Sequence, residues 1–346
     1  MSGGITQLVS TGVQDEFITG NPEVSFFKTN YRRHTNFAQC VSRQVIRGNP
    51  APGGTSTVRL EHLGDLVSSM YLTSESTTSA VERHWSNIIE SVELHIGDQL
   101  IDKQDFTFSN DLAVDLFATN MSKSFWGGHY SGGSGTQWFY PLRFFCCETS
   151  QSALPLISLQ YHDVVIKINW SNSFDPATNK MNFYANFIYL DAYERNKFST
   201  SPQQLLIYQV QKTLGSNGPV QNFYFNHPVK FIAAKESSDA CTSNTSQLTF
   251  QINGVDLSDK KYAKPHYTMI PSYYSAPYAA GNEDAYFLHA FCLDTSSIQP
   301  SGTLNFSRVD SARLMSDNQN FTSTFYAVNY NILKIESGMG GLLYAD

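Results

Sequence analysis

The sequence predicts an all-β fold in two similar halves, and three observations lead to this prediction. Short runs in which apolar and polar residues alternate recur along the whole chain, as expected of half-buried strands. Long helical periodicity is scarce, which argues against the repeated β-α units of α/β enzymes. One strand–turn–strand sequence also occurs twice, with its turn glycine first at Gly97 and again at Gly254.

The two hairpins around these glycines are the clearest local predictions. Residues 92–96 alternate apolar with polar side chains and end at a Gly97-Asp98 turn, and residues 248–252 do the same before Asn253-Gly254. Glycine after a short polar residue, or before it, is typical of tight hairpin turns. Because the flanking sequences resemble each other, we interpret the recurrence as a duplication of two β domains. Chance convergence of strand–turn–strand sequences is the alternative.

Other segments extend this interpretation along the chain. Residues 326–332 form a further strand with its apolar side chains on one face. Residues 154–170 alternate too, but the phase flips at His162-Asp163, which predicts a bulge or a bend. Two short helices are predicted, at residues 111–122 and 201–211. Residues 49–54 and 127–135 are loops, and residues 198–202 mark the domain boundary.

The composition fits a β-rich protein with a partly covered surface. Charged residues make up only 15% of the 346 residues, whereas aromatic residues reach 14%. Strands favour aromatic residues, and the cores of protein interfaces lose charge and gain them. The net charge of −7 excludes a polyanion binder as a whole, yet residues 24–60 contain no acid. Six basic residues lie there: Lys28, Arg32, Arg33, Arg43, Arg47 and Arg59. We expect them to pair with acids elsewhere in an assembly, with nucleic acid or anionic lipid as alternatives.

The five cysteines indicate no disulfide framework and no metal site. They are Cys40, Cys146, Cys147, Cys241 and Cys292, an odd number without metal-site or redox spacing, so we expect reduced thiols. The N-terminus has neither the basic nor the apolar region of a signal peptide. No apolar run approaches the ~20 residues that span a bilayer.

A search for catalytic chemistry yields no candidate residue. The glycine-rich residues 127–135 lack the lysine of a phosphate-binding loop, and no nucleophile elbow or clustered histidines occur. His162 beside Asp163 is the one suggestive pair, and we interpret it as a structural turn. The sequence therefore predicts no catalytic, cofactor-binding or metal-binding residue. Five glycosylation triplets leave glycan attachment open, at Asn120, Asn169, Asn244, Asn305 and Asn320.

Several motifs, in order along both halves, resemble one known family. They are residues 3–15 (GGITQLVSTGVQD), 25–28 (SFFK), 31–37 (YRRHTNF), 88–94 (IIESVEL), 153–163 (ALPLISLQYHD), 189–195 (YLDAYER) and 305–308 (NFSR). Together they are similar to the major capsid proteins of nucleocytoplasmic large DNA viruses. The resemblance is weakest at residues 106–138 and 213–297.

This resemblance implies a double jelly roll, which is two tandem eight-stranded antiparallel jelly rolls. It implies an N-terminal arm over residues 1–24, a first roll over 25–198 and a second roll over 199–346. Three chains would form a pseudo-hexagonal capsomer of an icosahedral shell. The implied partners are two further copies, neighbouring capsomers, minor capsid and penton proteins, and an inner membrane contacted through the N-terminal region, with no specific nucleic acid. The implied location is the virion, after assembly in the host cytoplasm.

Three other interpretations remain open at this point. A minor capsid component would share the same fold, and this chain is short for a large-virus member. A jelly-roll carbohydrate-binding protein would expose aromatic residues along a groove. A cupin-like enzyme would need clustered histidines, and their absence favours a protein that is not an enzyme.

Overall fold

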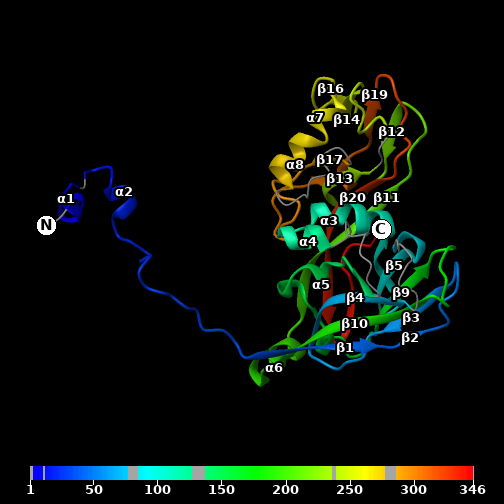
Figure 1. Cartoon of the computed structure of the whole chain (residues 1–346), viewed down its shortest axis with the longest axis horizontal. Coiled ribbons are helices and arrows are strands. Elements are labelled where there is room, and N and C mark those ends of the chain that lie inside the picture. Colours follow the sequence, from blue (N-terminus) through cyan, green and yellow to red (C-terminus); the bar gives the residue numbers. More distant parts are fainter. Residues whose placement is uncertain are drawn as a thin grey trace. The chain divides into compact units, whose positions relative to one another are not determined.

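The computed structural model describes residues 3–10, 12–76, 85–126, 137–235, 239–276 and 286–345. These residues fall into two units, which are residues 1–36 and residues 37–346. The first unit contains the short helices α1 (Gly3–Val9) and α2 (Glu16–Thr19), and all of its described side chains are exposed. The second unit, here called the body, contains all strands of the described residues (Figure 1).

The first half of the body is a pair of antiparallel sheets. Sheet A has the strand order β1-β10-β4-β7, with β1 (Phe37–Gln44), β10 (Asn179–Leu190), β4 (Leu66–Ser76) and β7 (Gln137–Pro141). Sheet B has the order β2-β3-β9-β5-β6, with β2 (Ile46–Arg47), β3 (Thr55–Arg59), β9 (Val164–Trp170), β5 (Ile89–Ile96) and β6 (Gln99–Asp105). The short β8 (Leu154–Pro155) pairs with β4.

The second half repeats this design. Sheet C has the order β11-β20-β13-β17, with β11 (Gln203–Thr213), β20 (Phe325–Glu336), β13 (Pro228–Ala234) and β17 (Phe287–Ala290). Sheet D has the order β12-β19-β14-β15, with β12 (Val220–Phe223), β19 (Ala312–Ser316), β14 (Gln247–Ile252) and β15 (Val255–Asp256). Three short strands complete these sheets: β16 (Lys261–Tyr262) on β14, β18 (Leu304–Asn305) on β13, and β21 (Met339–Leu342) on β20.

Both halves share one topology. Numbered along each half, the eight principal strands pair in the order first-eighth-third-sixth in one sheet and second-seventh-fourth-fifth in the other. This is an eight-stranded jelly roll, and its occurrence twice confirms the double jelly roll. The hairpins at Gly97 and Gly254 join the equivalent fourth and fifth strands. The topology thus supports duplication over chance.

In the body, the helices of the described residues lie in connections between strands. The segment between β6 and β7 holds the π-helix η2 (Thr107–Leu112), α3 (Ala113–Leu116) and α4 (Met121–Trp126). The equivalent segment of the second roll holds α7 (Ala263–His266) and α8 (Met269–Ser275). Elsewhere lie α5 (Phe145–Glu148) and α6 (Ala192–Thr200), and the single-turn helices η1 (Trp85–Asn87), η3 (Ser150–Ser152), η4 (Leu156–Ser158) and η5 (Phe306–Arg308).

Several local predictions can be compared with these elements. The two hairpins and the strand at residues 326–332 are confirmed as β5–β6, β14–β15 and β20. The helix predicted at residues 111–122 is broken into the end of η2, then α3 and the start of α4. The helix predicted at residues 201–211 is wrong, because these residues enter β11, which pairs with β20 along its whole length. Residues 127–135 lie outside the described residues.

A bend is confirmed close to the predicted position. It lies at residues 160–161, and β9 begins at Val164, directly after His162-Asp163, with strict alternation of buried side chains. Residues 154–161, however, form β8, the 3-10 helix η4 and a bend, not one long strand. The second roll has the same sequence of elements, because β18 and η5 precede β19. A short strand and one helical turn before the seventh principal strand are therefore part of the duplicated unit.

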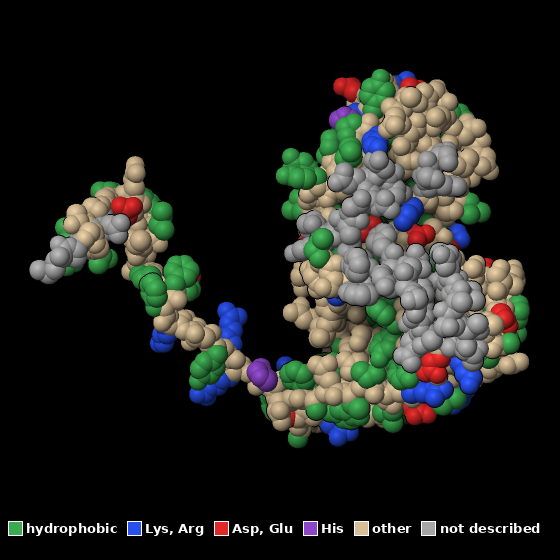
Figure 2. All heavy atoms as spheres, viewed as in Figure 1, with side chains coloured by type: hydrophobic (Ala, Val, Ile, Leu, Met, Phe, Trp, Pro, Cys, Tyr) green, Lys and Arg blue, Asp and Glu red, His purple; other side chains and the backbone are tan. Residues whose placement is uncertain are grey.

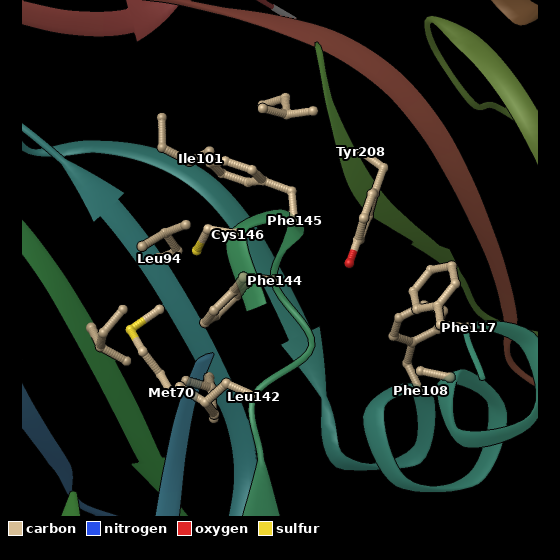
Figure 3. Packing of buried hydrophobic residues seen from close by; sticks show 14 of the residues in the cluster. Met70, Leu94, Ile101, Phe108, Phe117, Leu142, Phe144, Phe145, Cys146 and Tyr208 are labelled. Carbon is tan, nitrogen blue, oxygen red and sulfur yellow. The ribbon is translucent and has the colours of Figure 1, made fainter. Parts of the chain in front are cut away.

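The largest hydrophobic core belongs to the first roll but extends into the second. It includes Met70, Leu94 and Phe144 of the first roll and Tyr208 of the second (Figure 3). Phe231 and other residues of sheet C also belong to it. The opposite face of sheet C packs on a separate core inside the second roll. Sheet C is consequently buried on both faces, which explains why seven consecutive residues at the start of β20 are buried.

Candidate functional site

The joint between the two rolls brings together polar groups that were far apart in the sequence. Asp102 on β6 is completely buried, and its Oδ1 accepts a hydrogen bond from the Val210 amide on β11 at 2.9 Å. Its Oδ2 accepts one from Gln104 Nε2 at 2.7 Å. Both β6 and β11 are edge strands, so the carboxylate satisfies an amide that its own sheet leaves unpaired. Burial raises the pKa of Asp102 to about 7, against the effect of these donors.

A second polar chain runs from this joint toward the surface. Gln104 Nε2 and the Tyr208 hydroxyl both donate to the backbone oxygen of Arg143, at 2.8 and 3.2 Å. The Arg143 guanidinium pairs with Glu148 at 3.2 Å, and both side chains are more than nine-tenths buried. Lys123 lies 3.5 Å from the same carboxylate. These groups hold η2, α4 and α5 against the sheets, and we see in them a structural network.

His162 and Asp163, the pair singled out in the sequence, contact different partners. The Nδ1 atom of His162 lies 2.9 Å from the carbonyl oxygen and 3.2 Å from the amide nitrogen of Gly340, on β21 of the second roll. Asp163 pairs with Arg59 of β3 at 2.6 Å. Neither contact has the arrangement of a base with a nucleophile. These two contacts hold the bend before β9 in place. Arg59, one of the six basic residues within residues 24–60, thus pairs with an acid of its own chain.

The remaining sequence candidates are spread over both units. Lys28, Arg32 and Arg33 lie in the first unit, whereas Arg43 and Arg47 are exposed on β1 and β2. The five cysteines are free thiols, of which Cys40 is exposed. Of the glycosylation triplets, four asparagines are exposed. Asn169 is half-buried in β9, where its amide donates to Ser91 at 2.9 Å.

Within the described ranges, no three histidine, cysteine or acidic side chains gather as a metal site would require. No helix of that part of the chain has the length and hydropathy to cross a bilayer. One open cavity of about 360 Å³ lies between the outer face of sheet A and the segments around α4 and α5. Its wall includes the rings of Tyr71 and Phe139, and Lys123 and Glu148 lie at its polar end. Ion pairing already engages both of these charges.

The body also has large apolar side chains at its surface. On α8, Tyr273 and Tyr274 are 77% and 74% exposed. Leu293, in the segment after β17, is 78% exposed. On the outer face of sheet A, Tyr71 stacks on Tyr184 with ring centroids 5.5 Å apart. Figure 2 shows hydrophobic side chains along the edge of the second roll where Figure 1 places α7 and α8. Large exposed apolar patches mark interaction surfaces.

Two tandem jelly rolls with a shared joint and exposed apolar surfaces define a class, the double jelly-roll capsid subunits. Residues 25–191 match the model of the major capsid protein N-terminus, and residues 194–341 match that of the large eukaryotic DNA virus major capsid protein. The chain belongs to the major capsid protein family of large eukaryotic DNA viruses. The two matches meet at the start of α6.

Individual relatives agree with this assignment. The chain is 32% identical to the major capsid protein of Pyramimonas orientalis virus and 30% identical to that of Paramecium bursaria Chlorella virus 1, with 100% of each chain covered. Among solved structures, the PBCV-1 capsid model is similar with a TM-score of 0.79 and 25% identity, over 93% of this chain and 100% of that chain. The Faustovirus major capsid protein shares the fold, with a TM-score of 0.62 and 10% identity over 94% of both chains.

Proposed function

We propose that this major capsid protein works as a homotrimer, in which three chains place six jelly rolls in one pseudo-hexagonal capsomer. The observation that carries the proposal is an aromatic surface outside the cores of both rolls. On α8, Tyr273 and Tyr274 are exposed. On the outer face of sheet A, exposed Phe139 packs against Tyr71, which is half-buried and stacks on Tyr184. A low-charge, aromatic-rich chain keeps such surfaces soluble when closed symmetry covers them. Its role is structural, and no step of the proposal needs catalysis or a cofactor.

A sizing column with light-scattering detection tests this state. The expected mass is about three times the 38.7 kDa of one chain, and it should persist on dilution because obligate interfaces commonly bury more than ~2,000 Å². Folding and assembly would then be linked, so that subunits separate only as they unfold. A monodisperse monomer at micromolar concentration, with native strand content, would contradict the proposal.

The N-terminal arm, residues 1–24, is proposed to order at the base of the capsomer against neighbouring subunits. Its apolar side chains, among them Leu8, Val9 and Phe17, are exposed, and too few for a core of its own. Segments of this kind order when they bind. Deleting residues 2–24 should leave a soluble, folded subunit with reduced assembly. An isolated subunit that unfolds on this deletion would show that the arm belongs to the body.

The wider partners follow from the same role. Neighbouring capsomers, minor capsid and penton proteins, and an inner membrane near the basic residues 28–33 are proposed contacts, with the virion as the location after cytoplasmic assembly. Copy number per particle separates this role from that of a minor component. The aromatic pair Tyr71 and Tyr184 favours carbohydrate binding as the second candidate function. Glycan-array binding by the isolated protein would support that candidate.

A further inference from the structure

The joint inside one chain has a simple construction. The segment between β6 and β7 lays its aromatic side chains on the outer face of sheet C, the face that points away from the second roll's own core. Phe117 meets Tyr208 with ring centroids 4.9 Å apart and Phe231 at 6.1 Å. Phe108 meets Tyr326 at 5.5 Å. Figure 3 shows Phe117 beside Tyr208, and Figure 1 shows α3 between the two rolls.

The joint has two partners, the helical segment between β6 and β7 and the outer face of sheet C. Each has an equivalent in the other roll, and within the described residues these two equivalents do not form such a joint. The segment equivalent to η2–α3 is α7–α8 of the second roll, and its Tyr273 and Tyr274 project with rings 4.9 Å apart. The surface equivalent to the outer face of sheet C is the outer face of sheet A. There, Phe139 is 45% exposed and packs edge-on against Tyr71.

From this duplication, we infer that α8 of one copy docks on the outer face of sheet A of a second copy, repeating between chains the joint that links the rolls within a chain. The inference deepens the proposed trimer and rests on it. Every roll would then cover the next roll's outer sheet with its helical segment. In the second roll's sheet, Phe231 and Tyr326 of the equivalent face are almost completely buried, which shows how much apolar area such a joint removes from water.

The chemistry of the two surfaces is compatible. The cavity beside Tyr71 and Phe139 offers a pocket for an aromatic side chain, and aromatic anchors in pockets dominate binding at protein interfaces. Arg43 lies opposite Tyr184 in the register of β1 and β10, on the same outer face. An exposed guanidinium at this position can stack on an incoming tyrosine ring. The helix α8 itself contains no acidic or basic residue.

The contact is heterologous, because each chain gives one helix and receives another on a different surface. Heterologous contacts form closed rings when the rotation permits, and two rolls per chain would give six equivalent joints around a trimer. Three of these joints are the ones seen within the chains. The other three are the ones inferred here.

The first test replaces Tyr273→Glu and Tyr274→Glu together. Both side chains are exposed, so the subunit should fold, while charge in the pocket should weaken the trimer at least about tenfold. The matched control is Tyr224→Glu, which alters a tyrosine of the same roll that is 82% exposed and lies outside both surfaces. If the double variant forms a trimer as stable as that of the control variant, the inference is overturned, while the proposed trimer itself still stands.

The second test exploits the heterologous geometry. The variant with Tyr273→Glu and Tyr274→Glu, whose α8 surface is disrupted, is mixed with a second variant. In the second variant, Tyr71→Glu and Phe139→Glu disrupt the outer face of sheet A. One variant keeps an intact sheet A face and the other keeps an intact α8. The mixture should therefore form 1:1 dimers that neither variant forms alone. No dimer from two folded variants would overturn the inference. A wild-type chain that is itself monomeric would instead remove the proposed trimer, so the two failures are distinguishable.

Discussion

Phe117 of the first roll packs against Tyr208 of the second, with ring centroids 4.9 Å apart. Because both residues belong to one continuous core, the rolls are not independent domains joined by a linker. Asp102 and Val210 add a buried hydrogen bond to the same joint. The two rolls should therefore unfold in one cooperative transition.

Replacing Phe117→Ala should destabilise the whole body by about 3–5 kcal/mol, since the ring is almost completely buried and its loss leaves a cavity. Urea unfolding followed by fluorescence and circular dichroism should show one transition at a lower midpoint. Tyr224→Ala, an exposed aromatic truncation, should change the free energy of unfolding by less than about 0.5 kcal/mol. Two separate transitions, of which Phe117→Ala moves one alone, would contradict a shared core.

The same joint explains where the sequence misleads. Within residues 201–211, where a helix was predicted, Ile207 and Tyr208 are adjacent and both apolar, which breaks the alternation of a strand. In the structure both are buried, and both belong to the core that the two rolls share. A strand covered on both faces loses the period of two that identifies half-buried strands. The first roll covers one of those faces, and no local pattern shows this.

The hairpins were predictable for the opposite reason. Gly97 and Gly254 have positive φ angles of 54° and 79°, which is a local requirement that the sequence displays directly. The assembly surfaces are harder to derive. Tyr273 and Tyr274 are aromatic residues of a type that also occurs in cores, and only the fold shows that they are exposed. Similarly, Asp102 and Val210 lie 108 residues apart, and no spacing rule joins them.

The two turn glycines provide a matched pair of substitutions. An alanine Cβ at Gly97 would clash with the imidazole ring of His162, whereas a Cβ at Gly254 would meet open space. Gly254→Ala should cost about 1 kcal/mol from the positive φ alone. Gly97→Ala should cost clearly more, because His162 must move and it also contacts Gly340 of the second roll. Equal losses in thermal or urea unfolding would show that the histidine shifts freely.

Thiol reactivity should separate the five cysteines. In denatured, unreduced protein, titration should find about five free thiols, and a tight stoichiometric zinc content would contradict this. In native protein Cys40 should react first, since it is exposed. Burial raises the pKa of Cys241, and the neighbouring Cys147 together with burial raises that of Cys146. These two should stay unreactive until unfolding. Cys40→Ser should remove the fast phase and leave the slow phases unchanged.

Asp102 should make the stability of the joint depend on pH. Burial raises its pKa from an ordinary 3.8 to about 7, so between these values the folded protein holds more protons than the unfolded chain. The free energy of unfolding should therefore fall as the pH rises through this window, by up to about 1.4 kcal/mol per pH unit from this group. Stability from the neutral carboxyl is present at acidic pH and lost above about pH 7.

Asp102→Asn is the test of this dependence. Its amide oxygen can still accept the Val210 hydrogen bond, and no proton is exchanged at any pH in the window. Urea unfolding of both proteins at several values between pH 4 and pH 8 should give a wild-type-minus-variant difference that declines toward high pH. Asp310→Asn serves as a control for loss of one acid, because Asp310 is an exposed residue just before β19 of the second roll. A difference that stays flat across the range would show that Asp102 is ionised throughout and that the joint tolerates its charge.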